Sequence, residues 1–133
     1  MVILFDRFNI PEDVFEIIFA TEQQIIVAKE LTKYIIFNKG EITKTAMSIF
    51  ATKLHDGTYE SVLDRGQYKG KKVKLSYNKR QFYDRILTPM KAMGIIDYDL
   101  YKKTYKISTK FQNDMIKIGL MWKEELRKLG ASV

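Results

Sequence analysis

The sequence predicts a mainly α-helical domain that carries a small β-hairpin, which is an α+β fold. Apolar residues recur at spacings of three and four through most of the 133 residues, as they do in helices that cover a core. Residue pairs typical of helix caps precede several of these stretches. Two short segments at residues 95–96 and 104–108, expected to be strands and joined by a polar, basic connection, predict the hairpin. Apolar residues make up 46% of the chain, enough for a folded core.

Residues 1–20 are expected to form an N-terminal extension with a short helix. Pro11, Glu12 and Asp13 favour a helix start, because proline fits the first turn and acidic side chains complement the positive end of the helix dipole. Residues 1–10 contain neither a signal peptide pattern nor a spanning segment. The chain has no cysteine, which excludes disulfides and thiolate metal sites. We therefore expect a cytoplasmic protein that does not contact a membrane.

The next helix is predicted from Thr21 to Phe37. Thr21 and Gln24 have the spacing of a capping box, and residues 38–40, Asn-Lys-Gly, are typical of a left-handed helix stop. The side chains expected to face the core are Ile25, Ala28, Leu31, Tyr34 and Ile35.

A further helix is predicted after a short bridging strand at residues 41–42. Thr43 is expected to cap it, and it continues through Leu54. Its predicted inward face consists of Ala46, Ile49, Phe50 and Leu54. Residues 55–75 then break the periodicity with three glycines among polar residues, which predicts a mobile basic loop with a short helix near residues 59–63. The lysines of this loop are Lys69, Lys71, Lys72 and Lys74.

Two helices and the hairpin follow. One helix is predicted to begin at Ser76 or Asn78 and to continue to Met93, with Gly94 as its stop. After the hairpin, Thr109 is expected to cap a long helix that ends at Leu129. The apolar stripe of this last helix contains Phe111, Met115, Ile118, Trp122, Leu126 and Leu129.

Basic charge is concentrated in the second half of the chain. Residues 1–64 hold 6 basic and 10 acidic side chains, whereas residues 65–133 hold 17 basic and 6 acidic ones. Within residues 65–110 there are 13 basic and 3 acidic side chains. A positive field of this density attracts a polyanion such as nucleic acid, although an ordinary solvated basic face would have the same composition.

The order of the predicted elements and one local pattern resemble a known family. In residues 87–96, Leu87 and Met90 are spaced to seat a helix on the core, Gly94 reverses the chain, and two isoleucines follow. This pattern resembles the end of the recognition helix and the first wing strand of winged-helix, or winged helix-turn-helix, DNA-binding domains. Residues 105–109 resemble the returning wing strand. The resemblance covers residues 21–108.

The chain departs from the family pattern in two places. The connection at residues 55–75 is far longer than the tight turn usual between the second and third helices, so it is an insertion. Pro89 lies inside the recognition helix, where it removes a backbone donor and is expected to kink the helix or end it early.

The resemblance implies a DNA-binding surface. The first half of the recognition helix would face the major groove, with Tyr83, Ile86 and Leu87 pointing inward. The side chains implied to read bases are Lys79, Arg80, Gln81, Asp84 and Arg85. Lys102 and Lys103 at the wing tip would meet phosphate or the minor groove, and the lysines of residues 69–74 would contact the backbone.

Aromatic residues interleave with these lysines, which leaves two interpretations open. Single-strand binders stack bases on exposed aromatic rings, but such rings more often belong to the core. The residues concerned are Tyr59, Tyr68, Tyr77, Phe82, Tyr98 and Tyr101.

Enzyme motifs are weak. His55 is the sole histidine, so a metal cluster or a catalytic triad would lack partners, and residues 66–72 are one residue short of a phosphate-binding loop. We expect no catalytic activity, cofactor, metal or small-molecule ligand.

The sequence therefore predicts a sequence-specific double-stranded DNA-binding protein, a transcriptional regulator that forms a homodimer through residues 109–133. A role in replication initiation or plasmid partition, and a winged helix used as a protein-protein interaction module, are the alternatives.

Overall fold

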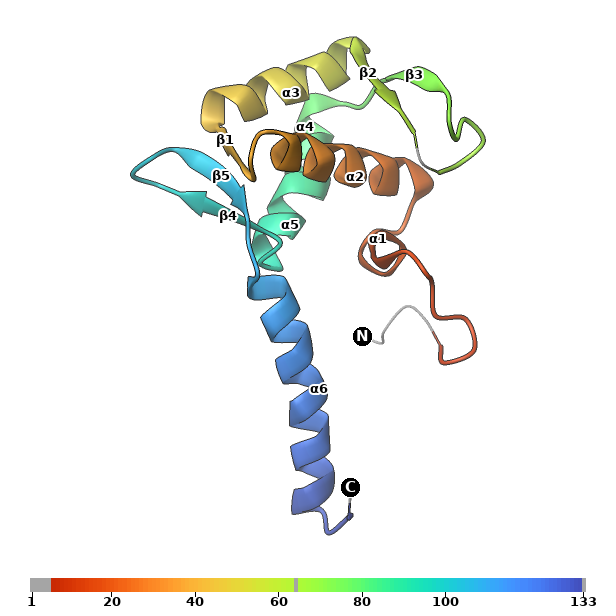
Figure 1. Ribbon diagram of the computed structural model, residues 1–133, viewed down its shortest axis with the longest axis vertical. Helices are drawn as coiled ribbons and strands as arrows, with labels where there is room; N and C mark the ends of the chain where they lie inside the picture. Colours follow the sequence, from red (N-terminus) through yellow and green to blue (C-terminus); the bar gives the residue numbers. More distant parts are fainter. Residues whose placement is uncertain (1–5, 64, 133) are drawn as a thin grey trace.

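The computed structural model describes residues 6–63 and 65–132, and it shows an α+β fold (Figure 1). Within these residues lie a three-stranded antiparallel sheet, a separate two-stranded hairpin, a group of packed helices and a long C-terminal helix. Residues 1–5 of the expected N-terminal extension and residue 133 of the expected C-terminal segment lie outside the described residues.

The first two helices begin at side-chain caps. Helix α1 (Val14–Ile18) starts where the Asp13 carboxylate accepts a hydrogen bond from the Phe15 amide. Helix α2 (Glu22–Phe37) starts where the Thr21 hydroxyl accepts one from the Gln24 amide at 3.2 Å. It ends before two residues of positive φ, 64° at Lys39 and 85° at Gly40, so the predicted cap and stop are confirmed.

Strand β1 (Glu41–Thr43) leads directly into helix α3 (Lys44–Asp56), which begins where the Thr43 hydroxyl accepts the Ala46 amide at 3.0 Å. The predicted cap is therefore confirmed. The predicted inward face is partly wrong, because Ile49 is 50% exposed. The buried face keeps the predicted Phe50 and Leu54 but has Met47 and Ala51 in place of Ala46 and Ile49.

The expected mobile basic loop at residues 55–75 is instead largely a β-hairpin. Strand β2 (Tyr59–Val62) pairs antiparallel with strand β3 (Lys72–Leu75), so the short helix predicted near residues 59–63 was wrong. Tyr59 pairs with Leu75 and Glu60 with Lys74, and side chains alternate between a half-buried inner face and an exposed outer face. Lysines fill the outer face of β3 and alternate with Val73 and Leu75, the period of two that is typical of a strand.

The helix predicted to begin at Ser76 or Asn78 begins at Asn78, whose side chain accepts the Gln81 amide at 3.0 Å. It consists of helix α4 (Lys79–Phe82), a π-helical turn η1 (Tyr83–Leu87) and helix α5 (Thr88–Ala92) without interruption, and is called helix 79–92 below. Pro89 neither ends it early nor breaks it. The π-helical turn ends two residues before the proline, and its wider hydrogen bond runs from the Thr88 amide to the Tyr83 carbonyl.

Strand β4 (Ile96–Asp99) and strand β5 (Thr104–Ile107) form the predicted hairpin, and β1 pairs with β5 to give the strand order β1-β5-β4. Helix α6 (Lys110–Lys128) follows. Thr109 forms no side-chain cap, contrary to prediction, because the preceding residue replaces it: the Ser108 hydroxyl accepts the Lys110 amide at 3.1 Å.

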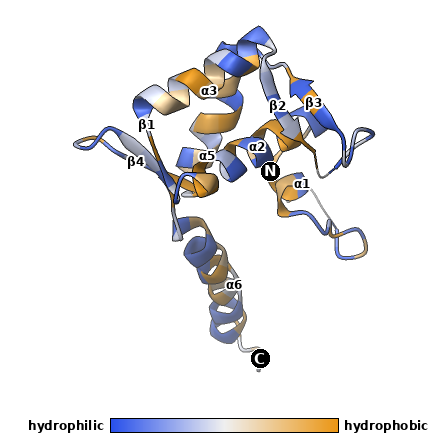
Figure 2. Cartoon of the chain, turned by 45° about the horizontal axis from the view of Figure 1, so that its top comes forward, coloured by the Kyte–Doolittle hydropathy of each residue, from blue (hydrophilic) through white to orange (hydrophobic). Residues whose placement is uncertain are grey.

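The core lies between α2, α3, helix 79–92 and the three-stranded sheet. Phe50 is at its centre, with the rings of Tyr34, Tyr59 and Phe82 at centroid distances of 4.9–5.5 Å. Helix α6 points away from this core as a rod (Figure 1) and shows hydrophobic turns among hydrophilic ones along its length (Figure 2). Of the helices among residues 6–63 and 65–132, none is long and apolar enough to cross a membrane.

Candidate nucleic-acid interface

Helix 79–92 separates a buried face from an exposed polar face at its start. Phe82, Ile86 and Leu87 are at most 1% exposed. On the other face, the Arg80 side chain is 92% exposed and the Asp84 side chain 67%. Gln81 and Arg85 are exposed beside them, and Tyr83 is half-buried. Four of the five side chains expected to read bases therefore lie on one accessible surface.

Lys79 has a different position from the other four. Its side chain folds back onto α3, where the ammonium donates to the Thr52 hydroxyl at 2.9 Å. Its backbone amide donates to Nδ1 of His55 at 3.2 Å. Lys79 and His55 therefore fix the start of helix 79–92 against the end of α3, and the Lys79 ammonium is turned toward α3 rather than outward with the other four side chains.

The charges on the exposed face remain accessible. The nearest opposite pair, Arg80 with Asp84, is separated by 3.8 Å and lies in solvent. Exposed ion pairs of this kind contribute little to the free energy of unfolding, so either side chain can readily leave the pair for another partner. The Arg80 guanidinium is therefore available to a ligand such as a base edge or a phosphate.

The β4–β5 turn presents the two predicted lysines, Lys102 and Lys103, and both are exposed. The Asp99 carboxylate organises this turn by accepting the Tyr101 amide at 2.9 Å and the Lys102 amide at 3.0 Å. The Lys102 hydrogen bond, together with the one from Tyr101 and nearby lysine charges, keeps the pKa of Asp99 below its ordinary value. The turn is thus shaped by a carboxylate that stays ionised.

One basic residue at this surface was missed by the sequence analysis. The Lys44 amide donates to the Lys103 carbonyl at 2.9 Å, so the start of α3 lies against the β4–β5 turn. Lys44 is exposed there and adds a third lysine to the same tip. The pairing of β1 with β5 produces this neighbourhood, and a single sequence does not reveal that pairing.

The β2–β3 hairpin carries the remaining predicted lysines. Lys69 and Lys71 lie in its exposed connection, and Lys72 and Lys74 lie on the outer face of β3. The Glu60 carboxylate on β2 is 3.2 Å from the Lys72 ammonium and 4.0 Å from that of Lys74. One acid thus offsets part of the positive charge on this face.

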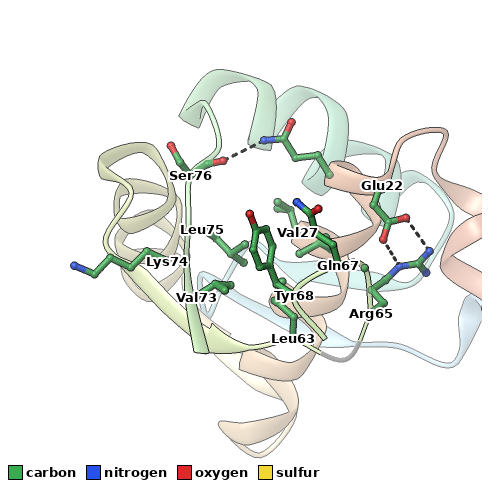
Figure 3. A pocket seen from close by; sticks show the side chains of 13 residues that line it. Glu22, Val27, Leu63, Arg65, Gln67, Tyr68, Val73, Lys74, Leu75 and Ser76 are labelled. Atoms are coloured by element: carbon green, nitrogen blue, oxygen red, sulfur yellow. Dashed lines mark hydrogen bonds and ion pairs between the residues drawn. The ribbon is translucent and has the colours of Figure 1, made fainter. Parts of the chain in front are cut away.

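Arg65, part of the basic segment by sequence, is neutralised by three carboxylates. Its guanidinium is 2.8 Å from Asp13, 2.7 Å from Glu16 and 2.7 Å from Glu22. The hydrogen bond to Glu22 is the main reason why the pKa of Arg65 lies above its ordinary value. This Arg65 cluster joins the end of the hairpin to α1 and α2, so its charge is not available to a polyanion. Figure 3 shows the pair with Glu22.

A second polar contact, the side-chain hydrogen bond between Tyr59 of β2 and Glu30 of α2, joins the hairpin to α2. Glu30 is only 2% exposed and is 3.0 Å from the Lys33 ammonium. Burial, reinforced by the negative charge of Glu30, raises the pKa of Tyr59 to about 12. The phenol therefore stays protonated and holds β2 beside α2.

A cavity of about 660 Å³ lies between α2 and the β2–β3 hairpin (Figure 3). Ile26, Val27, Leu63 and Val73 give it an apolar lining, and Glu22 and Arg65 lie at its side. The expectation of no small-molecule ligand is not tested by this hollow. Its structural consequence is clear: the hairpin meets α2 over an incompletely filled contact.

The aromatic residues divide between the two interpretations. Tyr77 and Phe82 are buried, at 6% and 0% exposed, and Tyr59 and Tyr98 are half-buried against other rings. These four belong to the core. Tyr68 is 49% exposed and Tyr101 is 98% exposed, so these two remain accessible for stacking.

Helix α6 presents the predicted dimerisation stripe to solvent. All of its residues are described, and none is buried. Met115, Ile118, Trp122 and the adjoining Leu129 are 46–73% exposed, and Phe111 and Leu126 are partly covered. The predicted stripe therefore exists, and among residues 6–63 and 65–132 no other element buries any of its side chains.

Among the described residues, no group of three or more histidine, aspartate and glutamate side chains is placed to hold a metal ion. Comparison with family models, curated proteins and solved structures found no match for the chain. Its function is therefore inferred from its own residues and their geometry.

Proposed function

We propose that this chain is a sequence-specific double-stranded DNA-binding protein with a winged-helix architecture, and that it acts as a dimeric transcriptional regulator. One observation carries the proposal: helix 79–92 buries one face in the core and leaves Arg80, Gln81 and Arg85 exposed on the other. A lysine-tipped hairpin follows it within the same basic segment.

The element order supports the winged-helix assignment. Helix α2, strand β1, helix α3, helix 79–92 and the β4–β5 hairpin follow one another as in that architecture, and the strand order β1-β5-β4 places the first strand beside the returning wing strand. The β2–β3 hairpin is then an insertion between the second and third helices.

Base readout is assigned to the start of helix 79–92. An α-helix fits the major groove, where arginine forms two hydrogen bonds with a guanine edge and glutamine two with an adenine edge. Arg80, Gln81 and Arg85 have the required donors and acceptors, and Asp84 can accept from a cytosine amino group.

Phosphate contacts are assigned to the lysines around this helix. Lys44, Lys102 and Lys103 share the tip of the β4–β5 hairpin, where they would fix the register of the domain on the duplex. The exposed lysines of the β2–β3 hairpin would add affinity without sequence information.

Selection of duplexes from a random pool, followed by gel-shift titration, tests the proposal. We expect a defined motif, and we expect the R80A/R85A variant to lose at least tenfold in preference for it, since each bidentate base contact contributes about 1–3 kcal/mol of discrimination. The matched control is K117A/K123A, which removes two exposed cations from α6. Absence of binding at low salt, or equal loss in both variants, would contradict the proposal.

The selected motifs also separate the regulatory role from the alternatives. Sites in promoters favour a regulator, whereas sites clustered at a replication origin favour replication initiation or partition. A protein that keeps its cellular role when Arg80 and Arg85 are reversed in charge would be an interaction module.

A further inference from the structure

The partner of α6 can be inferred from the arrangement of charges along its apolar stripe. The helix has 19 residues and is about 28 Å long at 1.5 Å per residue. Its stripe runs from Phe111 to Leu129 on one side. Glu125 lies in the seam of this stripe, three residues after Trp122 and four before Leu129, and Asp114 and Lys128 border the stripe on one flank. This helix packs its apolar side against no core, and a large exposed apolar surface of this kind indicates a binding surface. We therefore expect another surface to cover it.

We propose that the stripe pairs with the same stripe of a second copy of this chain, and that the two helices are antiparallel. This inference deepens the dimer of the proposed function. In the matching register, Phe111 lies opposite Leu129 of the partner subunit, and Ile118 lies opposite Trp122 of the partner subunit.

Charge complementarity selects this orientation. In the antiparallel register, Asp114 lies beside Lys128 of the partner subunit, and the two-fold axis repeats the pair at the other end of the interface. Glu125 then faces Met115 of the partner subunit, with its carboxylate free to turn to solvent.

The parallel orientation fails on the same residues. In a parallel pair each seam residue faces its own copy, so Glu125 would face Glu125 of the partner subunit within the apolar seam. Asp114 would lie beside Gly119 of the partner subunit and would have no opposite charge there. Like charges at the seam are costly, whereas the antiparallel pair replaces them with two attractive contacts.

The orientation also places the two domains. Each domain is connected to the N-terminal end of its α6, at Lys110. An antiparallel pair of helices therefore holds the two domains at opposite ends of a rod about 28 Å long. That separation approaches one turn of B-DNA, about 34 Å, which is the usual spacing of two half-sites. A parallel pair would instead bring both domains to the same end.

Sedimentation equilibrium of the full chain without DNA tests the pairing. We expect a dimer, and we expect I118Q/W122Q to dissociate at least tenfold more readily. The matched control is I116Q/L120Q, because those two residues lie on the other side of α6 with 55% and 60% exposure, close to the 55% and 62% of Ile118 and Trp122. Since α6 buries no residue in its domain, circular dichroism should show that both variants stay folded.

Disulfide cross-linking tests the orientation, and the absence of native cysteine makes an introduced thiol unique. M115C is mixed with E125C carrying a mass tag, and the mixture is oxidised. Antiparallel pairing gives the mixed disulfide, because residues 115 and 125 face each other across the interface. Parallel pairing gives the two self-linked dimers instead, since each position then faces its own copy.

A charge swap completes the test. D114K should weaken the dimer, and D114K/K128D should restore it. A monomer at every concentration, loss of the dimer in I116Q/L120Q, or predominance of self-linked dimers overturns the inference. Because none of these measurements uses DNA, their failure is distinguishable from failure of the proposed function, which the gel-shift titration reports separately.

Discussion

The two β-hairpins of this protein have the same secondary structure but are held by different forces. The β4–β5 hairpin shares its ladder with β1 and buries Ile96 and Tyr105 at 1% and 7% exposure. The β2–β3 hairpin pairs only with itself, and its inner residues, such as Val73, are half-buried over a cavity. The Arg65 cluster secures its far end.

This difference shows that two lysine-rich hairpins in one basic segment of the sequence need not have equal stability. Burial of apolar surface stabilises the β4–β5 hairpin with little dependence on salt, whereas ion pairs respond to ionic strength and to acid. The β4–β5 hairpin should therefore unfold with the whole domain, and the β2–β3 hairpin should open separately, as weakly packed segments do.

The largest expected effect comes from Ile96→Ala in the β4–β5 hairpin. Truncation of a fully buried isoleucine should lower the free energy of unfolding by about 2–4 kcal/mol, measured by urea denaturation. The control is Val73→Ala in the β2–β3 hairpin, where a half-buried side chain over a cavity should cost roughly 1 kcal/mol or less. Equal losses would remove the distinction between the two hairpins.

Arg65→Met should have the next largest effect, and a local one. It leaves Asp13, Glu16 and Glu22 close together without their shared cation, a change that we expect to cost about 1–3 kcal/mol. Hydrogen exchange should show faster exchange of the β2–β3 amides, with the β4–β5 amides unchanged.

Lys72→Met is the matched control for Arg65→Met, because it removes an exposed cation that pairs with Glu60 on the same hairpin. It should change exchange rates little. Faster exchange in both hairpins after Arg65→Met would show that the cluster stabilises the whole domain.

Acid should open the β2–β3 hairpin before the rest of the fold. Burial opposes ionisation of Asp13, but hydrogen bonds from Lys29 and the Phe15 amide and the charges of Lys29 and Arg65 outweigh it and lower its pKa from 3.8. A lowered pKa means that this stability is present above the pKa of the unfolded chain and is lost as the pH falls through the lower, folded value. Exchange-rate profiles between about pH 6 and pH 3 should show β2–β3 protection falling first.

Substitution of exposed lysines in pairs should have the smallest effect on folding, but it should measurably change the salt dependence of DNA binding. Each lost phosphate contact lowers the salt slope of binding by about 0.9. K102A/K103A should therefore lower the slope by nearly two, whereas K72A/K74A should lower it less, since Glu60 already neutralises part of that charge. A gel-shift salt titration measures both slopes, and a larger loss in K72A/K74A would reverse the proposed roles.

Features that depend on near neighbours in sequence were predictable. Thr21, Thr43 and Asn78 each accept a hydrogen bond from an amide three residues later, so the starts of three helices follow from local sequence. Periodicity also placed Ile86 and Leu87 on the inner face of helix 79–92, but it missed Phe82, which is buried where Tyr83 is only half-buried. The β4–β5 hairpin was predicted as well.

Features that depend on distant residues were not predictable. Arg65 counts as a basic residue in sequence, but its partners lie 43–52 positions earlier in the chain. Lys44 joins the β4–β5 turn only through the pairing of β1 with β5. Strand β3 does alternate lysine with Val73 and Leu75, but β2 breaks the pattern, because Ser61 lies on its inner face and Val62 is 54% exposed on its outer face.

Gly94 lies at the junction between α6 and the domain. Its carbonyl accepts the Phe111 amide at 3.1 Å, and its φ is +78°. A Cβ atom at this position would lie 2.9 Å from that of Lys110, so any other residue would push the start of α6 aside. Because α6 buries no residue along its length, its packing would not resist a change of a few degrees in its direction at this point. The far end of the helix would be displaced most. One glycine thus sets the direction in which the rod leaves the domain.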